Sequence, residues 1–177
     1  MNVHRSRVAG SGYRDPVTRL LIVHHSPTPA TEGLTEAVVD GARDDAIEGV
    51  DVVVRSALDV TLADVTDADG FLLGTSANFG YMSGALKHVF DRFFLELGGA
   101  LSDDGSAGAS ADGRKPYGLW VHGRHDTTGA VRSVQSIAGA LPWAQSAPVL
   151  EVVGDVTDEH RGAARELGGT LAALLMD

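Results

Sequence analysis

The chain has 177 residues, of which 44% are hydrophobic, and it carries a formal net charge of −10 and no cysteine. This length and composition predict one globular domain with a substantial core, and the lack of cysteine excludes disulfides and thiolate metal sites. The negative charge argues against nucleic acid or an anionic membrane as a partner.

The N-terminal segment is basic but has no apolar stretch of the kind found in secretory signals. We therefore expect a flexible extension at residues 1–17, followed by a single domain at 18–177. No apolar run approaches the roughly 20 residues that span a bilayer. These features predict a cytoplasmic protein that does not enter a membrane.

Five apolar runs follow one another along the domain. Their apolar residues are mostly continuous rather than alternating, which is typical of parallel strands covered on both faces. The runs lie at 19–25, 50–56, 69–75, 115–123 and 147–154.

Helical periodicity separates most of these runs. Apolar stripes at helical spacing begin at Leu34, Leu86, Val131 and Ala164, and one short acidic stretch follows the second run. Strands that alternate with helices predict an α/β domain of three layers. Its core would be a doubly wound, five-stranded parallel sheet in the order 2-1-3-4-5. The Gly- and Ser-rich residues 98–115 predict a mobile surface loop.

A ligand site is expected where the strand order reverses, outside the carboxyl ends of the strands. The loops after the first, third and fourth strands meet at that point. They comprise residues 25–31, 75–83 and 122–129, which are also the most unusual stretches of the sequence.

The first of these loops places hydroxyl residues at Ser26, Thr28 and Thr31. Thr28 is a suitable helix N-cap, and Pro29 suits the first helical position because no N–H is needed there. A helix N-terminus also offers unpaired N–H groups and the positive end of a dipole, to which hydroxyls would add donors for a phosphate. Capping and phosphate binding both stay open at this point.

The second loop reads GTSANFGYMSG over 74–84. Phe79 and Tyr81 could pack against the core. Alternatively, Gly80 between them lets the backbone approach a flat ligand, on which an exposed aromatic ring could stack.

The third loop carries His122, Arg124, His125 and Asp126. One reading is an N-cap by Asp126 or Thr127 with solvated charges around it. Two histidines three residues apart, with no third ligand, do not predict a metal site. The sequence also lacks the motifs of a serine nucleophile elbow and of a nucleoside-triphosphate loop.

Two of the loops resemble known families. The first resembles the flavodoxin phosphate loop S/T-x-T-G-x-T. The second resembles the G-T-P-x-x-[FY]-G-x-M-x-G segment of the tryptophan-repressor-binding-protein family of NAD(P)H:quinone reductases, relatives of NADPH-dependent FMN reductases. The chain departs from these patterns at Pro29, where the family has Gly, and at Ser76, where it has Pro. The third loop also lacks the family's run of glycines.

The resemblance implies a flavodoxin-like fold that binds FMN, with the phosphate in the first loop and the isoalloxazine between the second and third. Arg124 and His125 are expected to be catalytic, because positive charge beside a reduced flavin would favour transfer of paired electrons. The residues expected to bind the cofactor are Ser26, Thr28, Ala30, Thr31, Thr75, Ser76, Ala77, Asn78, Phe79, Gly80, His122, Gly123 and Asp126.

These features predict an FMN-dependent oxidoreductase of the NAD(P)H:quinone or FMN reductase type. NAD(P)H would be the electron donor, a quinone or flavin the acceptor, and a homodimer or homotetramer the assembly. Two alternatives stay open. One is a flavodoxin-like one-electron carrier, which the acidity would suit, and the other is an FMN-free binding module, which Pro29 would suit.

Overall fold

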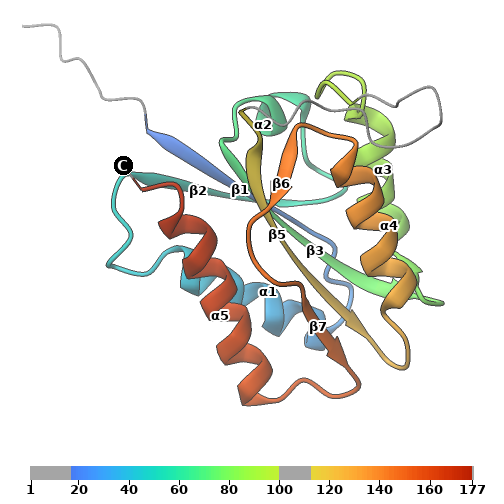
Figure 1. Cartoon of the computed structure of the whole chain (residues 1–177). Coiled ribbons are helices and arrows are strands. Elements are labelled where there is room, and N and C mark those ends of the chain that lie inside the picture. The colour runs from blue at the N-terminus through green and yellow to red at the C-terminus, as the bar shows by residue number, and fades with distance from the viewer. Residues whose placement is uncertain (1–16, 100–112, 177) are drawn as a thin grey trace, which may run out of the picture.

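The computed structural model of the chain describes residues 17–99 and 113–176. Most of the expected extension and most of the expected loop at 98–115 lie outside the described residues. The elements are β1 (Thr18–His24), α1 (Pro29–Ala42), β2 (Val50–Ser56), α2 (Leu62–Thr66), β3 (Gly70–Asn78), β4 (Tyr81–Met82), α3 (Gly84–Phe93), β5 (Lys115–Gly123), α4 (Thr128–Gly139), β6 (Trp143–Gln145), β7 (Leu150–Val153) and α5 (Asp158–Ala173) (Figure 1).

The strands form one sheet in the order β2-β1-β3-β5-β6. Because β5 is the fourth predicted strand, this is the predicted order 2-1-3-4-5, and the α/β class with its parallel sheet is confirmed. The sheet has seven strands rather than the five expected. β4 adds an antiparallel hairpin to β3, and two short strands replace the single fifth one.

The two strands at the fifth position pair with different parts of β5. β6 lies beside Lys115–Tyr117, and β7 lies beside Trp120–Gly123, both in parallel. The predicted run at 147–154 therefore corresponds to β7 alone. Because β7 pairs with the last residues of β5, the loop that follows β7 reaches the carboxyl edge of the sheet.

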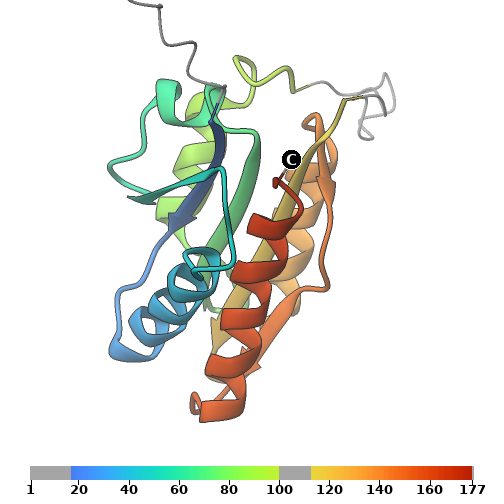
Figure 2. The ribbon, with the colours of Figure 1, turned by 90° about the vertical axis from the view of Figure 1, so that its left-hand side faces the viewer.

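Alternation along the central strands divides the core between the two faces of the sheet. Leu21 and Phe71 pack with α3 and α4, whereas Leu20, Leu72 and Trp120 pack with α1 and α5. Figure 2 shows α1 and α5 together on one side of the sheet, with α3 and α4 behind it. This is the predicted three-layer arrangement, built from strands that are apolar on both faces.

The third strand is longer than the run at 69–75, because residues 75–78 continue it rather than forming a loop. Gly74 therefore lies inside the strand. A Cβ at this position would come within 2.0 Å of Cζ2 of Trp120, so only glycine allows the buried indole to lie across β3. The indole fills the face toward α1 and α5, two register positions before Ser76 and His122.

None of the helices in the described ranges is both long and apolar enough to cross a membrane.

Candidate functional site

A cavity of about 430 Å³ lies at the carboxyl ends of the strands, between the start of α1 and the loop that precedes α5. Ligand pockets in proteins usually measure roughly 300–1,000 Å³. The lining comprises residues 27–31, 76–78, 122–124 and 154–156. The cavity therefore lies at the edge of the sheet where the sequence predicted a ligand site.

The structure brings together part of the predicted set of residues. Those that line the cavity are Thr28, Ala30, Thr31, Ser76, Ala77, Asn78, His122, Gly123 and Arg124. Those that lie outside its lining are Ser26, Thr75, Phe79, Gly80, His125 and Asp126.

The start of α1 is capped as the sequence predicted. The hydroxyl of Thr28 accepts a hydrogen bond from the N–H of Thr31 (3.3 Å), and the hydroxyl of Thr31 accepts one from the N–H of Thr28 (3.1 Å). The Thr31 hydroxyl donates to the carbonyl of Thr28 (2.9 Å), so the Thr28 hydroxyl is the donor in its 3.0 Å contact with the Thr31 hydroxyl. Pro29 occupies the first helical position, and the N–H of Ala30 has no partner among the described residues. Capping leaves this helix end able to bind an anion.

Ser26 does not share this role, because its side chain points away from the cavity. Its Oγ lies 2.9 Å from Nδ1 of His24 and 2.7 Å from the hydroxyl of Thr35. Burial lowers the pKa of His24, and the neighbouring His25 lowers it further. Ser26, which lies outside the cavity lining, thus ties the loop to β1 and α1.

On the second segment, Ser76 is the polar side chain at the floor of the cavity. Its hydroxyl is buried and has no hydrogen-bond partner among the described residues. Leaving such a group unpaired costs roughly 1–3 kcal/mol, so a hydrogen bond from a ligand to this hydroxyl would stabilise the protein. Thr75 has the opposite role: its hydroxyl donates to the carbonyl of Ser76 (2.9 Å) and accepts from the N–H of Ser83 (2.9 Å), which anchors the start of α3.

A tight turn follows, in which Asn78 pairs with Tyr81 across the β3–β4 hairpin. The two central residues, Phe79 and Gly80, both have positive φ angles, 51° and 78°. This backbone is typical of two-residue hairpin turns and is unfavourable for a large side chain. Phe79 is fully exposed, and Tyr81 is partly exposed. The alternative that Phe79 packs against the core is therefore wrong; its ring projects into solvent beside Asn78, at the rim of the cavity.

In the third loop, Arg124 does not present a free positive charge. Its guanidinium lies 2.6 Å from the carboxylate of Asp155, and both side chains are exposed. Because Asp155 also lines the cavity, the net charge on this wall is smaller than the sequence suggested. His125 is exposed and lies outside the cavity lining.

Asp126 caps the following helix. Its carboxylate accepts a hydrogen bond from the N–H of Thr128 (2.9 Å), and this bond holds the pKa of Asp126 below its usual range. The side chain of Thr127 makes no capping hydrogen bond. Thr127 holds the N-cap position, and the hydrogen bond to the start of the helix comes from Asp126, one residue earlier.

One wall of the cavity was not predicted from the sequence. Residues 154–156 follow β7 and are held against the end of β5, where Nε2 of His122 lies 2.8 Å from the carbonyl of Gly154. The available signal was the Gly–Asp pair at the end of the fifth apolar run, Gly154 and Asp155. The pair could not be assigned to the cavity from the sequence, because its position depends on the pairing of β7 with β5.

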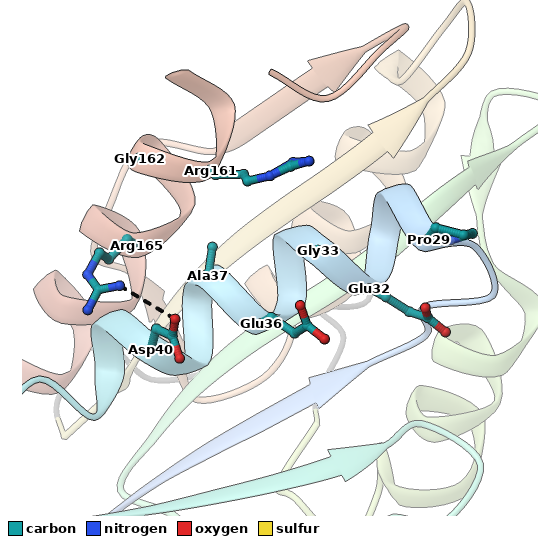
Figure 3. Close-up of a pocket in the computed structure, with 9 residues that line it drawn as sticks. All are labelled: Pro29, Glu32, Gly33, Glu36, Ala37, Asp40, Arg161, Gly162 and Arg165. Carbon is teal, nitrogen blue, oxygen red and sulfur yellow. Dashed lines mark hydrogen bonds and ion pairs between the residues drawn. The ribbon is translucent and has the colours of Figure 1, made fainter. Parts of the chain in front are cut away.

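A larger hollow of about 550 Å³ lies between α1 and α5 (Figure 3). It is a groove on the outer surface of the helices, and its charged residues are exposed. Arg165 reaches Asp40 across the groove at 3.5 Å. Apart from Pro29, none of its lining residues borders the cavity at the strand ends. We therefore place the candidate site in the cavity at the strand ends.

Comparison with known proteins shows the fold. No protein-family profile matches the chain. A curated flavodoxin of Aquifex aeolicus (strain VF5) is 30% identical over 95 residues, which cover 54% of this chain and 50% of that protein. The match thus spans about half the length of this relative.

The solved structures that are similar extend over most of the chain. A flavodoxin from the domain Archaea has a TM-score of 0.71 at 16% identity and covers 89% of this chain and 99% of its own. An azoreductase from Bacillus anthracis str. Sterne has a TM-score of 0.65 at 17% identity, and the match covers 88% of this chain and 98% of the azoreductase. A WrbA-like flavodoxin from Agrobacterium tumefaciens has a TM-score of 0.59 at 17% identity, and the match covers 89% of this chain and 97% of that flavodoxin.

Proposed function

Since the chain has the flavodoxin-like fold, we propose that the cavity at its strand ends binds FMN and that the protein is an FMN-dependent oxidoreductase. The observation that carries the proposal is the buried, unpaired hydroxyl of Ser76 in a cavity bordered by the N-terminus of α1. An unpaired polar group beside a helix N-terminus fits a ligand that has both polar and anionic parts.

The residues present fit the parts of FMN. The phosphate would lie at the start of α1, against the N–H of Ala30 and the hydroxyl of Thr28. Pro29 withholds one donor from this cradle, so we expect phosphate recognition to rest on fewer hydrogen bonds than in a loop with glycine there. The isoalloxazine would lie toward the second and third loops, where Phe79 offers an exposed aromatic surface.

The finer proposal is an NAD(P)H:quinone or FMN reductase. Bound FMN would supply the hydride-accepting and electron-transferring chemistry, which amino-acid side chains lack. The chain would bind the flavin, orient it and adjust the charge around it through Arg124. The family-like sequence of the second loop supports this type, and we propose a homodimer or homotetramer as the assembly.

A second candidate is a one-electron carrier. The ion pair of Arg124 with Asp155 favours it, because a neutralised arginine stabilises a negatively charged flavin less than a free one does. The net charge of −10 would also suit docking on a basic partner protein.

Flavin binding is tested first. Titration of the purified protein into FMN should quench the flavin fluorescence with a Kd at or below the micromolar range, and riboflavin should bind more weakly. If FMN at micromolar concentrations does not bind, the FMN proposal fails, and an FMN-free binding module becomes the reading that Pro29 supports.

The type of reaction is tested with the FMN-loaded protein. We expect NADH or NADPH to be oxidised in the presence of a quinone such as benzoquinone. A loaded protein that ignores both nucleotides, yet exchanges single electrons with a partner protein, would establish the carrier instead. Light scattering of the same preparation tests the proposed assembly, since a monomer with full activity would contradict it.

A further inference from the structure

Two side chains lie next to each other on the floor of the cavity. Ser76 of β3 and His122 of β5 are register partners on neighbouring parallel strands. They continue the alternation of Leu72 and Trp120 and therefore lie on the sheet face toward α1 and α5. Both line the cavity, between the start of α1 on one side and the loop at 154–156 on the other.

The contact of His122 with Gly154 determines which ring nitrogen carries the proton. A carbonyl oxygen only accepts hydrogen bonds, so at 2.8 Å Nε2 of His122 must be the donor. In the neutral imidazole, Nδ1 then holds a lone pair and acts as an acceptor. No other residue in the described part of the chain bonds to this nitrogen.

The floor of the cavity thus offers one hydroxyl and one acceptor nitrogen side by side. Ser76 can donate its unpaired proton, and Nδ1 of His122 can accept one. A phosphate or carboxylate oxygen satisfies only the first of these groups, and an ammonium satisfies only the second. An alcohol is both donor and acceptor, so a single hydroxyl satisfies both.

We propose that Ser76 and His122 form a recognition pair for an alcohol on a polyhydroxylated chain of the ligand. The inference rests on the proposed function and deepens it, because the polyol chain of FMN connects its phosphate to its ring. Thr28 of the phosphate cradle and Asn78, which precedes the hairpin turn, line the same cavity as the pair, so one ligand can contact all of these residues. Ser76 is also the position at which the chain departs from the proline of the family pattern, so this donor is a property of this chain.

Three flavins separate the parts of the ligand. FMN carries polyol and phosphate, riboflavin carries the polyol alone, and lumiflavin carries neither. We expect Ser76→Ala to weaken FMN and riboflavin each by about five- to tenfold, the effect of one buried hydrogen bond, and to leave lumiflavin unchanged. His122→Phe removes the acceptor and also the Nε2 hydrogen bond to Gly154, so it should weaken FMN and riboflavin at least as strongly as Ser76→Ala. Thr28→Ala is the contrast, because it should weaken FMN alone.

Fluorescence-quenching titrations supply the affinities, and thermal unfolding without ligand supplies the control for folding. Ser76→Ala should melt no lower than the unmodified protein, because the hydroxyl that it removes has no partner in the structure. A combined Ser76→Ala and His122→Phe variant should lose less than the product of the single effects, since both groups bind the same alcohol.

Several outcomes would overturn the inference. If Ser76→Ala weakens FMN but not riboflavin, the hydroxyl contacts the phosphate. If it weakens all three flavins equally, Ser76 affects the shape of the cavity but does not bind the polyol of the ligand. If it weakens none of them, Ser76 plays no part in binding. Absence of any flavin binding by the unmodified protein would end both this inference and the proposed function, whereas the other outcomes leave the proposed function intact.

Discussion

Phe79 lies in a backbone conformation that a residue of its size avoids, and replacing it should stabilise the protein. Its φ of 51° places it in the left-handed region, at the first central position of the turn between β3 and β4. Such turns favour Asn or Gly at this position, because their side chains tolerate positive φ. Phe79→Asn therefore fits the existing backbone better than the natural residue does.

The magnitude follows from strain and burial. A residue held in the left-handed region costs on the order of 1–3 kcal/mol, and asparagine relieves a part of this, so we expect a gain of about 1 kcal/mol. Phe79 is fully exposed, so the substitution removes no buried apolar surface that would offset the gain. For a chain of this length, about 1 kcal/mol corresponds to a rise in Tm of roughly 2–4 °C.

Urea unfolding of the unliganded protein measures the gain, and two further substitutions separate strain from aromaticity. Phe79→Leu keeps the strain but removes the ring, and Phe79→Tyr keeps both. If the ring contacts the flavin, Asn and Leu should each weaken FMN by roughly two- to tenfold, whereas Tyr should not. The asparagine variant alone should be more stable.

The predicted relief of backbone strain is contradicted if Phe79→Asn unfolds at the same or a lower urea concentration than Phe79→Leu. In that case the turn carries no strain that the side chain could relieve. If the asparagine variant is more stable and binds FMN unchanged, the strain is real, but the ring has no part in flavin binding.

Four other substitutions test the site and the elements around it. Thr28→Ala and Thr157→Ala each remove an N-cap hydroxyl and should lower the free energy of unfolding by about 1 kcal/mol. In FMN titrations Thr157→Ala is the control, and only Thr28→Ala should weaken binding, by about 1–2 kcal/mol. Asp155→Asn frees Arg124 from an exposed ion pair worth no more than about 1 kcal/mol, so calorimetric titration should show FMN binding tighten by up to about fivefold and riboflavin change little. The pKa of His24 is lowered from 6.5 by burial, so as the pH falls below about 6.5 the unfolded chain takes up the proton first and folding stability declines. His24→Gln should lose less stability over that window, as urea unfolding between about pH 8 and pH 5 would reveal, and an equal loss would show that another group titrates.

Most of the fold could be predicted, because its signals are local. The second and fourth apolar runs coincide with β2 and β5. β5 is buried along most of its length, and such parallel strands are continuous apolar stretches. β4 and β6 were missed because strands of two and three residues are too short to show a period. The extension of β3 to Asn78 was missed because its last residues are polar and small.

The site could be predicted only as far as loop positions allow. The strand order determined which loops meet, and the cavity lies at the edge of the sheet where the sequence predicted a ligand site. Side-chain directions depend on partners distant in the chain. Ser26 turns toward Thr35, and Arg124 turns toward Asp155, a residue that comes near only because β7 pairs with β5. Spacing along the sequence carries no signal for such contacts.

The division of the fifth strand also affects how the molecule meets other chains. An exposed sheet border is a template on which another polypeptide can add a strand, and long regular borders promote aggregation. Here that border is broken between β6 and β7, and the break contains Pro148, which has no N–H to donate. Neither short strand offers an incoming chain more than a few consecutive backbone groups. The interruption thus limits the addition of strands from other chains at this edge. We expect a variant in which residues 143–153 form one unbroken strand to aggregate.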